Sequence, residues 1–235
     1  MKYSILMDDS QRSRAYIQNL LIHNHLPQNV VIIKFKNFRI NSIIPKKITL
    51  NNRIEYNVNQ SVIKTLRKNR IDTILCRSED VNSDEVVSIV KNLCEDTILF
   101  SVSGGQILRR KILSLDKIFI HVHPGCLPDF RGSTLFYYTL LLSNEFSCSI
   151  IEIDKGIDTG EILFRKINKD VYPSINIDKY LDPLYRTDTL IDYFDQIRTG
   201  KDLVKISNKS IEPYYIVHPV IKNFLIAKYN SNNKG

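Results

Sequence analysis

The sequence predicts an α/β protein with a Rossmann-like, doubly wound and mostly parallel sheet, followed by a small helical and β extension at the carboxyl end. Three observations lead to this prediction. Short and nearly continuous apolar runs alternate with longer segments of helical period. Several of these runs are rich in β-branched residues, which favour strands. The chain has 235 residues, which is long enough to bury a substantial core.

The first half of the chain predicts strands that alternate with helices. The predicted strands are residues 3–7, 29–35, 71–76, 96–102 and 117–122. The predicted helices are residues 13–26, 60–69, 82–94 and 106–113. In the third helix, Asn82 and Glu85 have the spacing of a capping box. Residues 37–60 are polar and have no clear period, so we expect irregular structure there.

The second half predicts fewer elements. A helix is expected over 133–143, a strand over 147–153 and a further helix over 180–200. A short β pair is expected between residues 203–207 and 212–219, and a frayed tail over 229–235. The domain prediction is a catalytic α/β domain over 1–170 and an extension over 171–235.

The formal net charge of +8 suggests an anionic partner, which could be nucleic acid, a membrane surface or a phosphate-bearing small molecule. The basic residues are scattered and the chain has no tryptophan to stack on a base, so we expect a small molecule and no nucleic acid. No apolar run approaches the roughly 18 to 20 residues that cross a bilayer, so we expect no membrane span. The amino terminus does not resemble a signal peptide, which predicts a cytoplasmic protein.

The four cysteines are Cys76, Cys94, Cys126 and Cys148. None of them forms a C-x-x-C pair, so a cysteine-based zinc site is not expected and reduced thiols are. Cys76 and Cys148 lie in apolar runs and are predicted to be buried. Cys126 lies in a loop beside two histidines, where a nucleophilic role is an alternative.

His121 and His123 stand two residues apart at the end of a predicted strand, so their side chains project to the same side. A later loop, "DKGIDTG", offers Asp154 and Asp158. Ligands of open α/β sheets bind beyond the carboxyl ends of the strands, where these residues are expected. Three interpretations remain open at this point: a metal site, a His–Asp pair for proton transfer, or histidines that only brace a turn.

Two motifs carry a family resemblance. The segments "HVHPGCLPDFRGS" and "SIIEIDKGIDTGEIL" resemble the folate-dependent formyltransferases, which include methionyl-tRNA, glycinamide-ribonucleotide and sugar N-formyltransferases. The family pattern is N-x-H-P-x-x-L-P-x-x-x-G followed by D-x-G-x-D-x-G. Here Asp158 follows His123 by 35 residues, as the pattern requires. The resemblance covers about residues 96 to 166.

The resemblance implies formyl transfer from 10-formyltetrahydrofolate to an amine. It makes His123 the catalytic histidine and Asp158 its partner. His121 occupies the position of the family's oxyanion-polarising asparagine, and this is the main departure from the pattern. The resemblance also places the folate against two loops, with contacts from Gly104, Gly105, Gln106, Ile107, Leu108, Gly156 and Ile157.

Among these enzymes the chain is most similar to the sugar N-formyltransferases, which act on nucleotide-linked amino sugars for surface polysaccharides such as lipopolysaccharide O-antigen. No glycine-rich phosphate loop follows the first strand, unlike in the purine enzymes, and the segment after "DTGEIL" is short. A homodimer is a further expectation. The expected contacts to the sugar or phosphates are Ser10, Arg12, Arg14, Arg131, Tyr180 and Arg186. The alternatives are a metal-dependent hydrolase that uses His121 and His123, and an impaired formyltransferase-like binding protein.

Overall fold

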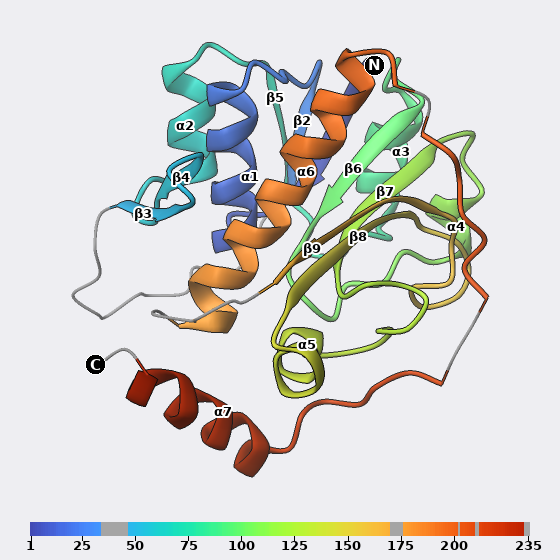
Figure 1. Ribbon diagram of the computed structural model, residues 1–235. Helices are drawn as coiled ribbons and strands as arrows, with labels where there is room; N and C mark the ends of the chain where they lie inside the picture. Colours follow the sequence, from blue (N-terminus) through green and yellow to red (C-terminus); the bar gives the residue numbers. More distant parts are fainter. Residues whose placement is uncertain (34–46, 170–175, 202, 210–211, 233–235) are drawn as a thin grey trace. The chain divides into compact units, whose positions relative to one another are not determined.

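The computed structural model describes residues 1–33, 47–169, 176–201, 203–209 and 212–232 (Figure 1). The chain forms two compact units, residues 1–121 and 122–235, and each is described by itself. The predicted domain boundary at 170/171 falls outside the described residues and stays a prediction.

The first unit contains a parallel sheet whose strand order is β5-β2-β1-β6-β7. Its strands are β1 (Tyr3–Met7), β2 (Val30–Ile33), β5 (Thr73–Cys76), β6 (Thr97–Ser101) and β7 (Ile118–Pro124). Its helices are α1 (Gln11–Ile22), α2 (Val62–Lys68), α3 (Asp84–Lys91) and α4 (Arg110–Leu113). Every residue of β1 and β2 is buried, which explains why these strands are continuous apolar runs. The five predicted strands of this half are confirmed.

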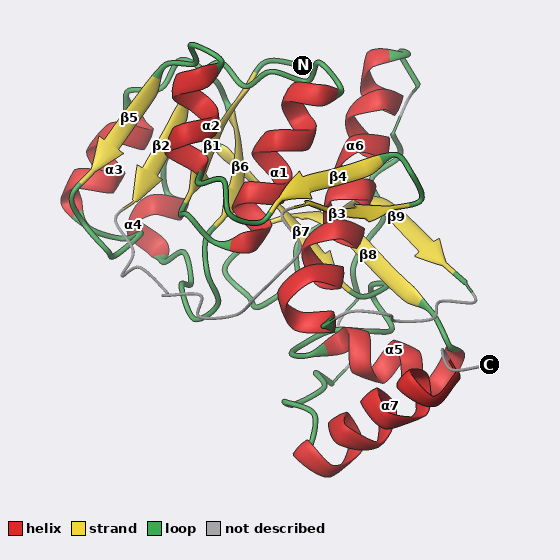
Figure 2. Cartoon of the chain, turned by 90° about the vertical axis from the view of Figure 1, so that its left-hand side faces the viewer, coloured by secondary structure: helices red, strands yellow, loops and turns green. Residues whose placement is uncertain are grey.

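The strand β7 ends in the second unit, where β8 (Phe146–Glu152) continues the sheet and pairs with the antiparallel strand β9 (Ile162–Asn168). The full order is β5-β2-β1-β6-β7-β8-β9, so the predicted α/β class with a mostly parallel sheet is confirmed. The helices of this unit are α5 (Leu135–Ser143), the π-helix η1 (Ile177–Leu181), α6 (Asp182–Arg198) and α7 (Pro219–Asn232). Figure 2 shows α7 beside α5, where Tyr229 Oη donates a hydrogen bond to the carbonyl oxygen of Leu140.

The expectation of irregular structure over 37–60 is wrong for its described part. Strands β3 (Lys47–Leu50) and β4 (Ile54–Asn57) form an antiparallel hairpin. Asn51 and Asn52 adopt φ values of 53° and 54° in the turn, which asparagine tolerates better than most residues. The two strands are only four residues long, and so short an alternation is a weak signal against a polar background. Residues 37–46 lie outside the described residues.

The predicted capping box of α3 is also wrong. Ser83 is the N-cap and its hydroxyl accepts a hydrogen bond from the backbone N–H of Val86. The Glu85 carboxylate instead accepts from the backbone N–H groups of Arg77 and Ser78. Asn82 turns toward the loop before α4, where its side chain bonds the backbone of Ile107 and Arg109. Of the predicted helix over 106–113, only the last turn forms, as α4 (Arg110–Leu113).

The carboxyl-terminal third differs most from expectation. The predicted β pair does not form; instead Ile206 bridges to Ile162 and Tyr214 bridges to Gly132. Strand β9 and helix α7 were not predicted, and residues 229–232 continue α7 rather than fray. The alternation along β9 is only half-buried, and α7 exposes Val220 and Phe224, so neither element has a strong periodic pattern.

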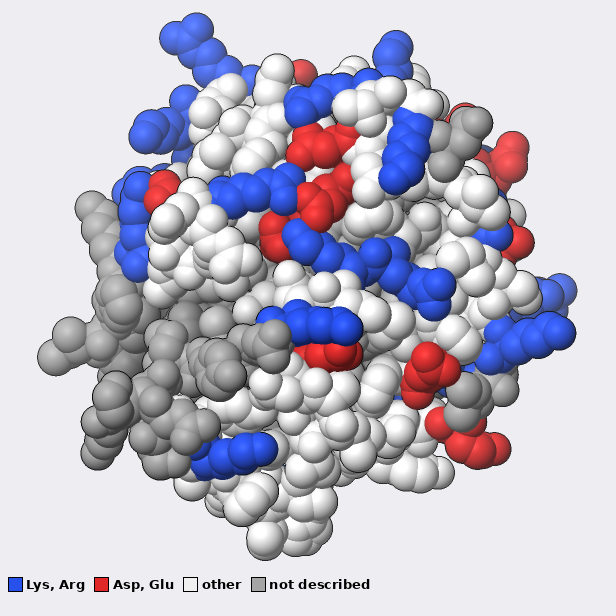
Figure 3. Space-filling model, in the orientation of Figure 1, with Lys and Arg blue, Asp and Glu red and all other residues white. Residues whose placement is uncertain are grey.

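Basic and acidic side chains are interspersed on the face drawn in Figure 3, with no large area of one sign. Among the described residues, no helix combines the length and apolar character needed to cross a membrane.

Candidate active site

His123 lies at the end of β7 and is almost completely buried, with 1% of its surface exposed. Its Nε2 atom lies 3.0 Å from the carbonyl oxygen of Phe130, and its Nδ1 atom lies 3.3 Å from Oδ1 of Asp158. The chain turns sharply after the strand, and Gly125 has a φ of +146°. A Cβ at Gly125 would lie 2.7 Å from the same Phe130 oxygen, so the close return of the loop requires a glycine.

The loop that carries Phe130 is held by a distant segment. The backbone N–H of Tyr214 donates to the carbonyl oxygen of Arg131 at 2.7 Å, and its carbonyl oxygen accepts from Ser133 at 3.0 Å. The rings of Phe130 and Tyr214 are stacked with centroids 5.7 Å apart. Gly132 approaches Tyr214 so closely that a side chain would overlap its carbonyl oxygen. Tyr214 therefore positions the acceptor of the His123 hydrogen bond.

The "DKGIDTG" loop is organised by its first aspartate and presents its second. Asp154 accepts hydrogen bonds from the backbone N–H of Gly156 at 3.0 Å and from Thr159 Oγ1 at 2.6 Å. Asp158 adopts a left-handed φ of 56°, and the Asn208 amide donates to its carbonyl oxygen at 2.8 Å. The two aspartates thus have different tasks, since Asp154 shapes the turn and Asp158 reaches His123.

The hydrogen-bond partners of His123 determine which of its ring nitrogens carries the proton. A carbonyl oxygen only accepts, so the His123 Nε2 atom must donate to Phe130. In the neutral ring, Nδ1 then carries a lone pair that faces the Asp158 carboxylate. A single added proton turns this juxtaposition into a hydrogen bond. The His123–Asp158 pair is therefore arranged to accept a proton and hold it.

Arg186 of α6 contacts the backbone of β7 directly beside His123. Its Nη1 atom donates to the carbonyl oxygen of Val122 at 2.7 Å, and its Nε atom donates to Asp182 at 2.7 Å. Arg186 is only 8% exposed. Tyr180, another predicted substrate contact, is buried in η1, and no hydrogen-bond partner for its hydroxyl occurs among the described residues. Arg131 contributes its carbonyl oxygen to the Tyr214 contact.

His121 lies on β7 two residues before His123. Its Nδ1 atom is 3.2 Å from the carbonyl oxygen of Phe100, so Nδ1 is the protonated nitrogen of the neutral ring. The rings of His121 and Phe100 lie 6.3 Å apart at 56°. In the neutral ring of His121, the lone pair is then on Nε2.

The predicted folate loop follows β6. A Cβ added to Gly104 or to Gly105 would meet nothing within 4 Å, and Gly105 has a φ of +91°. Ile107 is 58% exposed, whereas Leu108 is buried. The side chain of Gln106 accepts a 3.4 Å hydrogen bond from Val81. This loop thus presents open backbone and an exposed apolar side chain.

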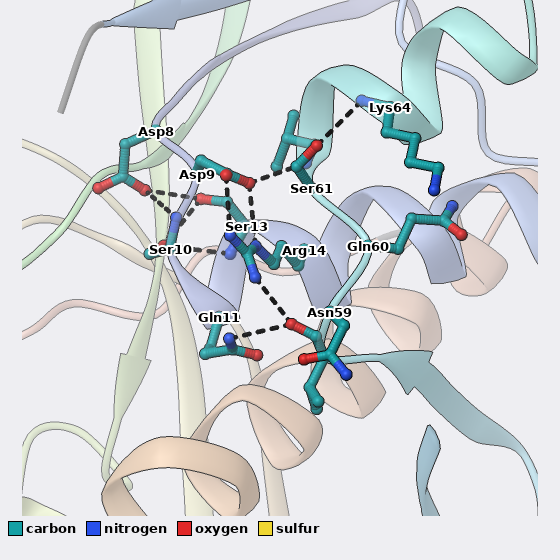
Figure 4. Close-up of polar contacts among 12 residues, drawn as sticks. Asp8, Asp9, Ser10, Gln11, Ser13, Arg14, Asn59, Gln60, Ser61 and Lys64 are labelled. Atoms are coloured by element: carbon teal, nitrogen blue, oxygen red, sulfur yellow. Dashed lines mark hydrogen bonds and ion pairs between the residues drawn. The ribbon is translucent and has the colours of Figure 1, made fainter. Parts of the chain in front are cut away.

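The residues predicted after the first strand are occupied by internal contacts (Figure 4). Ser10 caps α1 by accepting from the backbone N–H of Ser13. Arg14 pairs with Asp9 through two hydrogen bonds, at 2.8 and 3.0 Å, and donates to the carbonyl oxygen of Val58. Arg12 donates to the carbonyl oxygen of Val102. Their role as substrate contacts stays a prediction.

Sequence reasoning missed Asp8, Asn208 and Tyr214. A polar residue directly after an apolar strand was the available signal for Asp8. The Asn208 side chain and the Tyr214 backbone contact backbone groups that are far away in the sequence, and no local pattern marks either residue.

The thiol of Cys126 is half-buried in the loop after His123. Burial raises the pKa of this thiol, and the nearby Arg165 only partly offsets the effect. No group of three or more metal-ligating side chains occurs in the part of the chain that the structure describes.

No family model matches the chain. In sequence, it is 33% identical over 87 residues to methionyl-tRNA formyltransferase of Finegoldia magna, which is 36% of this chain and 28% of the relative. It is 28% identical over 148 residues to the Thermotoga maritima enzyme of the same name, which is 61% of this chain and 46% of the relative. The matched regions thus span less than half the length of these curated relatives.

Solved structures extend the likeness to nearly the whole chain. A sugar N-formyltransferase from Shewanella sp. FDAARGOS_354 matches with a TM-score of 0.54 and 18% identity, over 92% of this chain and 76% of that one. The chain has the formyltransferase fold. Glycinamide ribonucleotide transformylase 1 from Symbiobacterium toebii matches with a TM-score of 0.57 and 11% identity, over 87% and 90%. The Helicobacter canadensis N-formyltransferase, in complex with folinic acid and dTDP-3-aminofucose, matches with a TM-score of 0.55 and 17% identity, over 92% and 70%.

Proposed function

We propose that this formyltransferase-fold protein transfers a formyl group from 10-formyltetrahydrofolate to the amine of a nucleotide-linked amino sugar. The observation that carries the proposal is the contact of the buried His123 with Asp158, with 3.3 Å between Nδ1 and Oδ1. The two residues come from motifs 35 positions apart in the sequence, and these motifs are the ones that resemble the family.

The pair supplies the proton chemistry. The bound donor provides an electrophilic formyl carbon, and the reaction forms a carbon–nitrogen bond to the amine while the bond to the donor nitrogen breaks. The side chain of Asp158 is 19% exposed and that of His123 is 2% exposed, so Asp158 is the group that meets the amine. Asp158 accepts the amine proton, and His123 shares it through Nδ1. The pair can return the proton as the donor nitrogen departs.

His121 takes the oxyanion-polarising role in this proposal. Because its Nδ1–H is directed to Phe100, the ring can donate a hydrogen bond from Nε2 only when it is doubly protonated. A positively charged donor stabilises a developing oxyanion more strongly than a neutral one. In this respect the proposed site differs from one with an asparagine, whose amide donates a hydrogen bond without gaining a proton.

The proposed folate contacts fit the chemistry of a planar ligand with amide edges. Open backbone at Gly104 and Gly105 can reach polar edges of a ligand, and Ile107 exposes an apolar side chain. In the second unit, Ile157 is 61% exposed beside Gly156, which supports the same proposed role.

The identity of the amine that receives the formyl group is the most specific part of the proposal. Solved structures named as sugar N-formyltransferases support an amino sugar, and one of them holds dTDP-3-aminofucose. The sequence relatives are methionyl-tRNA formyltransferases, which makes methionyl-tRNA the second candidate acceptor. All four cysteines are free thiols, in agreement with the proposed cytoplasmic location.

The test is a transfer assay with the purified protein and 10-formyltetrahydrofolate. Nucleotide-linked amino sugars and methionyl-tRNA are offered separately, and products are read by mass spectrometry. A sugar product heavier by one formyl group, which His123→Ala abolishes, supports the proposal. If only methionyl-tRNA is formylated, methionyl-tRNA and not an amino sugar is the substrate. If no amine is formylated, the proposed function is wrong.

A further inference from the structure

Asp8, directly after β1, is a fully buried carboxylate whose two oxygens serve two different segments. Oδ1 accepts hydrogen bonds from the backbone N–H of Ser10 at 3.0 Å and from Ser13 Oγ at 3.1 Å (Figure 4). Oδ2 accepts from the backbone N–H of Ser103 at 2.8 Å and also from its hydroxyl. Asp8 thus ties the start of α1 to the residue before Gly104.

Two other side chains of α1 hold the same loop. Ser13 Oγ lies 2.8 Å from the carbonyl oxygen of Ser101 and 3.0 Å from its hydroxyl. Arg12 donates to the carbonyl oxygen of Val102. Three consecutive residues, 101 to 103, are therefore each bonded either to Asp8 or to the first turn of α1. Gly104 and Gly105 follow directly and have no side chains that could hold them in place. The orientation of their backbone therefore depends on the contacts of residues 101–103.

We propose that Asp8 is a positioning residue that fixes the backbone of residues 101–105 for the folate donor. The proposal rests on the proposed function, because it takes this loop as a folate contact. Asp8 itself is fully buried, so the proposed effect is indirect. Its effect passes through the Ser103 backbone to the open peptide units of Gly104 and Gly105.

The contact geometry predicts that an amide cannot replace this carboxylate. All the groups that face Asp8 donate hydrogen bonds, and an ionised carboxylate only accepts. Asparagine has the same shape but would direct an NH₂ group at one set of these donors. Either Ser103 or the start of α1 would then lose its partner.

The matched control is Asp9, the adjacent residue of the same type. Its carboxylate pairs with Arg14 and accepts from the backbone N–H of Val62, and these contacts do not involve residues 101–103. Asp9→Asn changes the charge by the same amount without breaking the loop anchor. Ser103→Ala is a milder test, because it removes the hydroxyl contact and keeps the backbone N–H.

The experiment measures the Kd of folinic acid by calorimetry and the hydrogen–deuterium exchange of the peptide over residues 101–108. Asp8→Asn is expected to weaken folinic acid about tenfold and to accelerate exchange in this peptide, whereas Asp9→Asn changes neither by more than about twofold. Ser103→Ala is expected to weaken binding about threefold. In the transfer assay, Asp8→Asn raises KM for the donor and leaves kcat within about threefold.

The failures can be told apart. If the wild-type protein does not bind folinic acid, the proposed function fails whatever the exchange shows. If it binds, and Asp8→Asn and Ser103→Ala keep the wild-type Kd and exchange, Asp8 is not a positioning residue. If Asp8→Asn does not fold, judged by circular dichroism, Ser103→Ala decides alone.

Discussion

The Nδ1 atom of His123 lies 3.3 Å from a carboxylate oxygen of Asp158. The opposite ring nitrogen lies 3.0 Å from the carbonyl oxygen of Phe130, so both sides of the imidazole face acceptors. This ring gains a hydrogen bond when the pair gains a proton.

Replacing Asp158 with asparagine should reduce kcat by about 10² to 10⁴-fold, because the amide cannot accept the proton and pass it to His123. Folinic acid should bind with an affinity close to that of the wild type. Initial rates and calorimetry provide the two measurements. Asp116→Asn, an exposed aspartate in the first unit, is the control. Turnover within tenfold of the wild type in Asp158→Asn would contradict the assigned proton path.

His121→Asn should retain activity in the transfer assay. An asparagine amide can donate a hydrogen bond to a developing oxyanion, whereas the neutral His121 ring directs its N–H to Phe100. Initial rates should therefore be equal to or higher than those of the wild type. His218→Asn, at an exposed position, should keep the wild-type rate. A folded but inactive His121→Asn protein would show that the ring has another task.

Arg186→Met should destabilise the protein by about 3 kcal/mol, since it leaves Asp182 and the Val122 carbonyl without their shared partner in a largely buried position. Arg186→Lys should recover part of the loss. Urea denaturation measures the free energy of unfolding. Arg198, on the same helix, pairs with Asp195 at an exposed position, and Arg198→Met should cost less than about 1 kcal/mol. Equal effects of the two methionine variants would refute the structural importance of Arg186.

Gly132→Ala should cost about 2 to 4 kcal/mol, since φ is +114° and the new methyl group would overlap the Tyr214 carbonyl oxygen. Gly104→Ala should unfold at nearly the wild-type temperature, because an added Cβ there meets nothing within 4 Å. Thermal melts compare the two. A melting temperature of Gly132→Ala within about 2 °C of the wild type would mean that the loop can relax away from Tyr214.

Cys126 should react slowly with iodoacetamide at pH 7, because burial raises the pKa of its thiol and the thiolate is the reacting form. Reaction should accelerate as the pH rises toward that raised pKa. Cys94 is exposed and should react first. Cys126→Ala should keep activity within about threefold, and a greater loss would revive the nucleophile hypothesis. Peptide mass spectrometry and the transfer assay test both parts.

The parallel strands could be predicted because both of their faces are buried, which makes β1 and β2 continuous apolar runs. The hairpin of β3 and β4 and the edge strand β9 are short or half-buried, so their patterns are diluted by polar residues. Helix α7 was missed because apolar residues occur around much of it, including the exposed Val220 and Phe224. Burial, and not propensity alone, therefore decided which elements could be predicted from the sequence.

The candidate site, too, could be predicted only in part. The relationship of His123 to Asp158 was predicted from two motifs and their separation, and the structure brings the two side chains together. Arg12, Arg14 and Arg186 were singled out for their charge, but charge alone does not show whether a guanidinium faces a ligand or a backbone carbonyl. Such contacts depend on which loops meet in space, and the sequence does not display that.

Tyr214 clasps the chain at Arg131 and Ser133, more than eighty residues earlier, and Phe130 in that loop faces His123. The backbone of Tyr214 therefore helps to determine where the carbonyl oxygen that faces the His123 ring lies. A substitution that displaces Tyr214 would reach His123 through the Phe130 loop, while every residue of the two motifs stays unchanged.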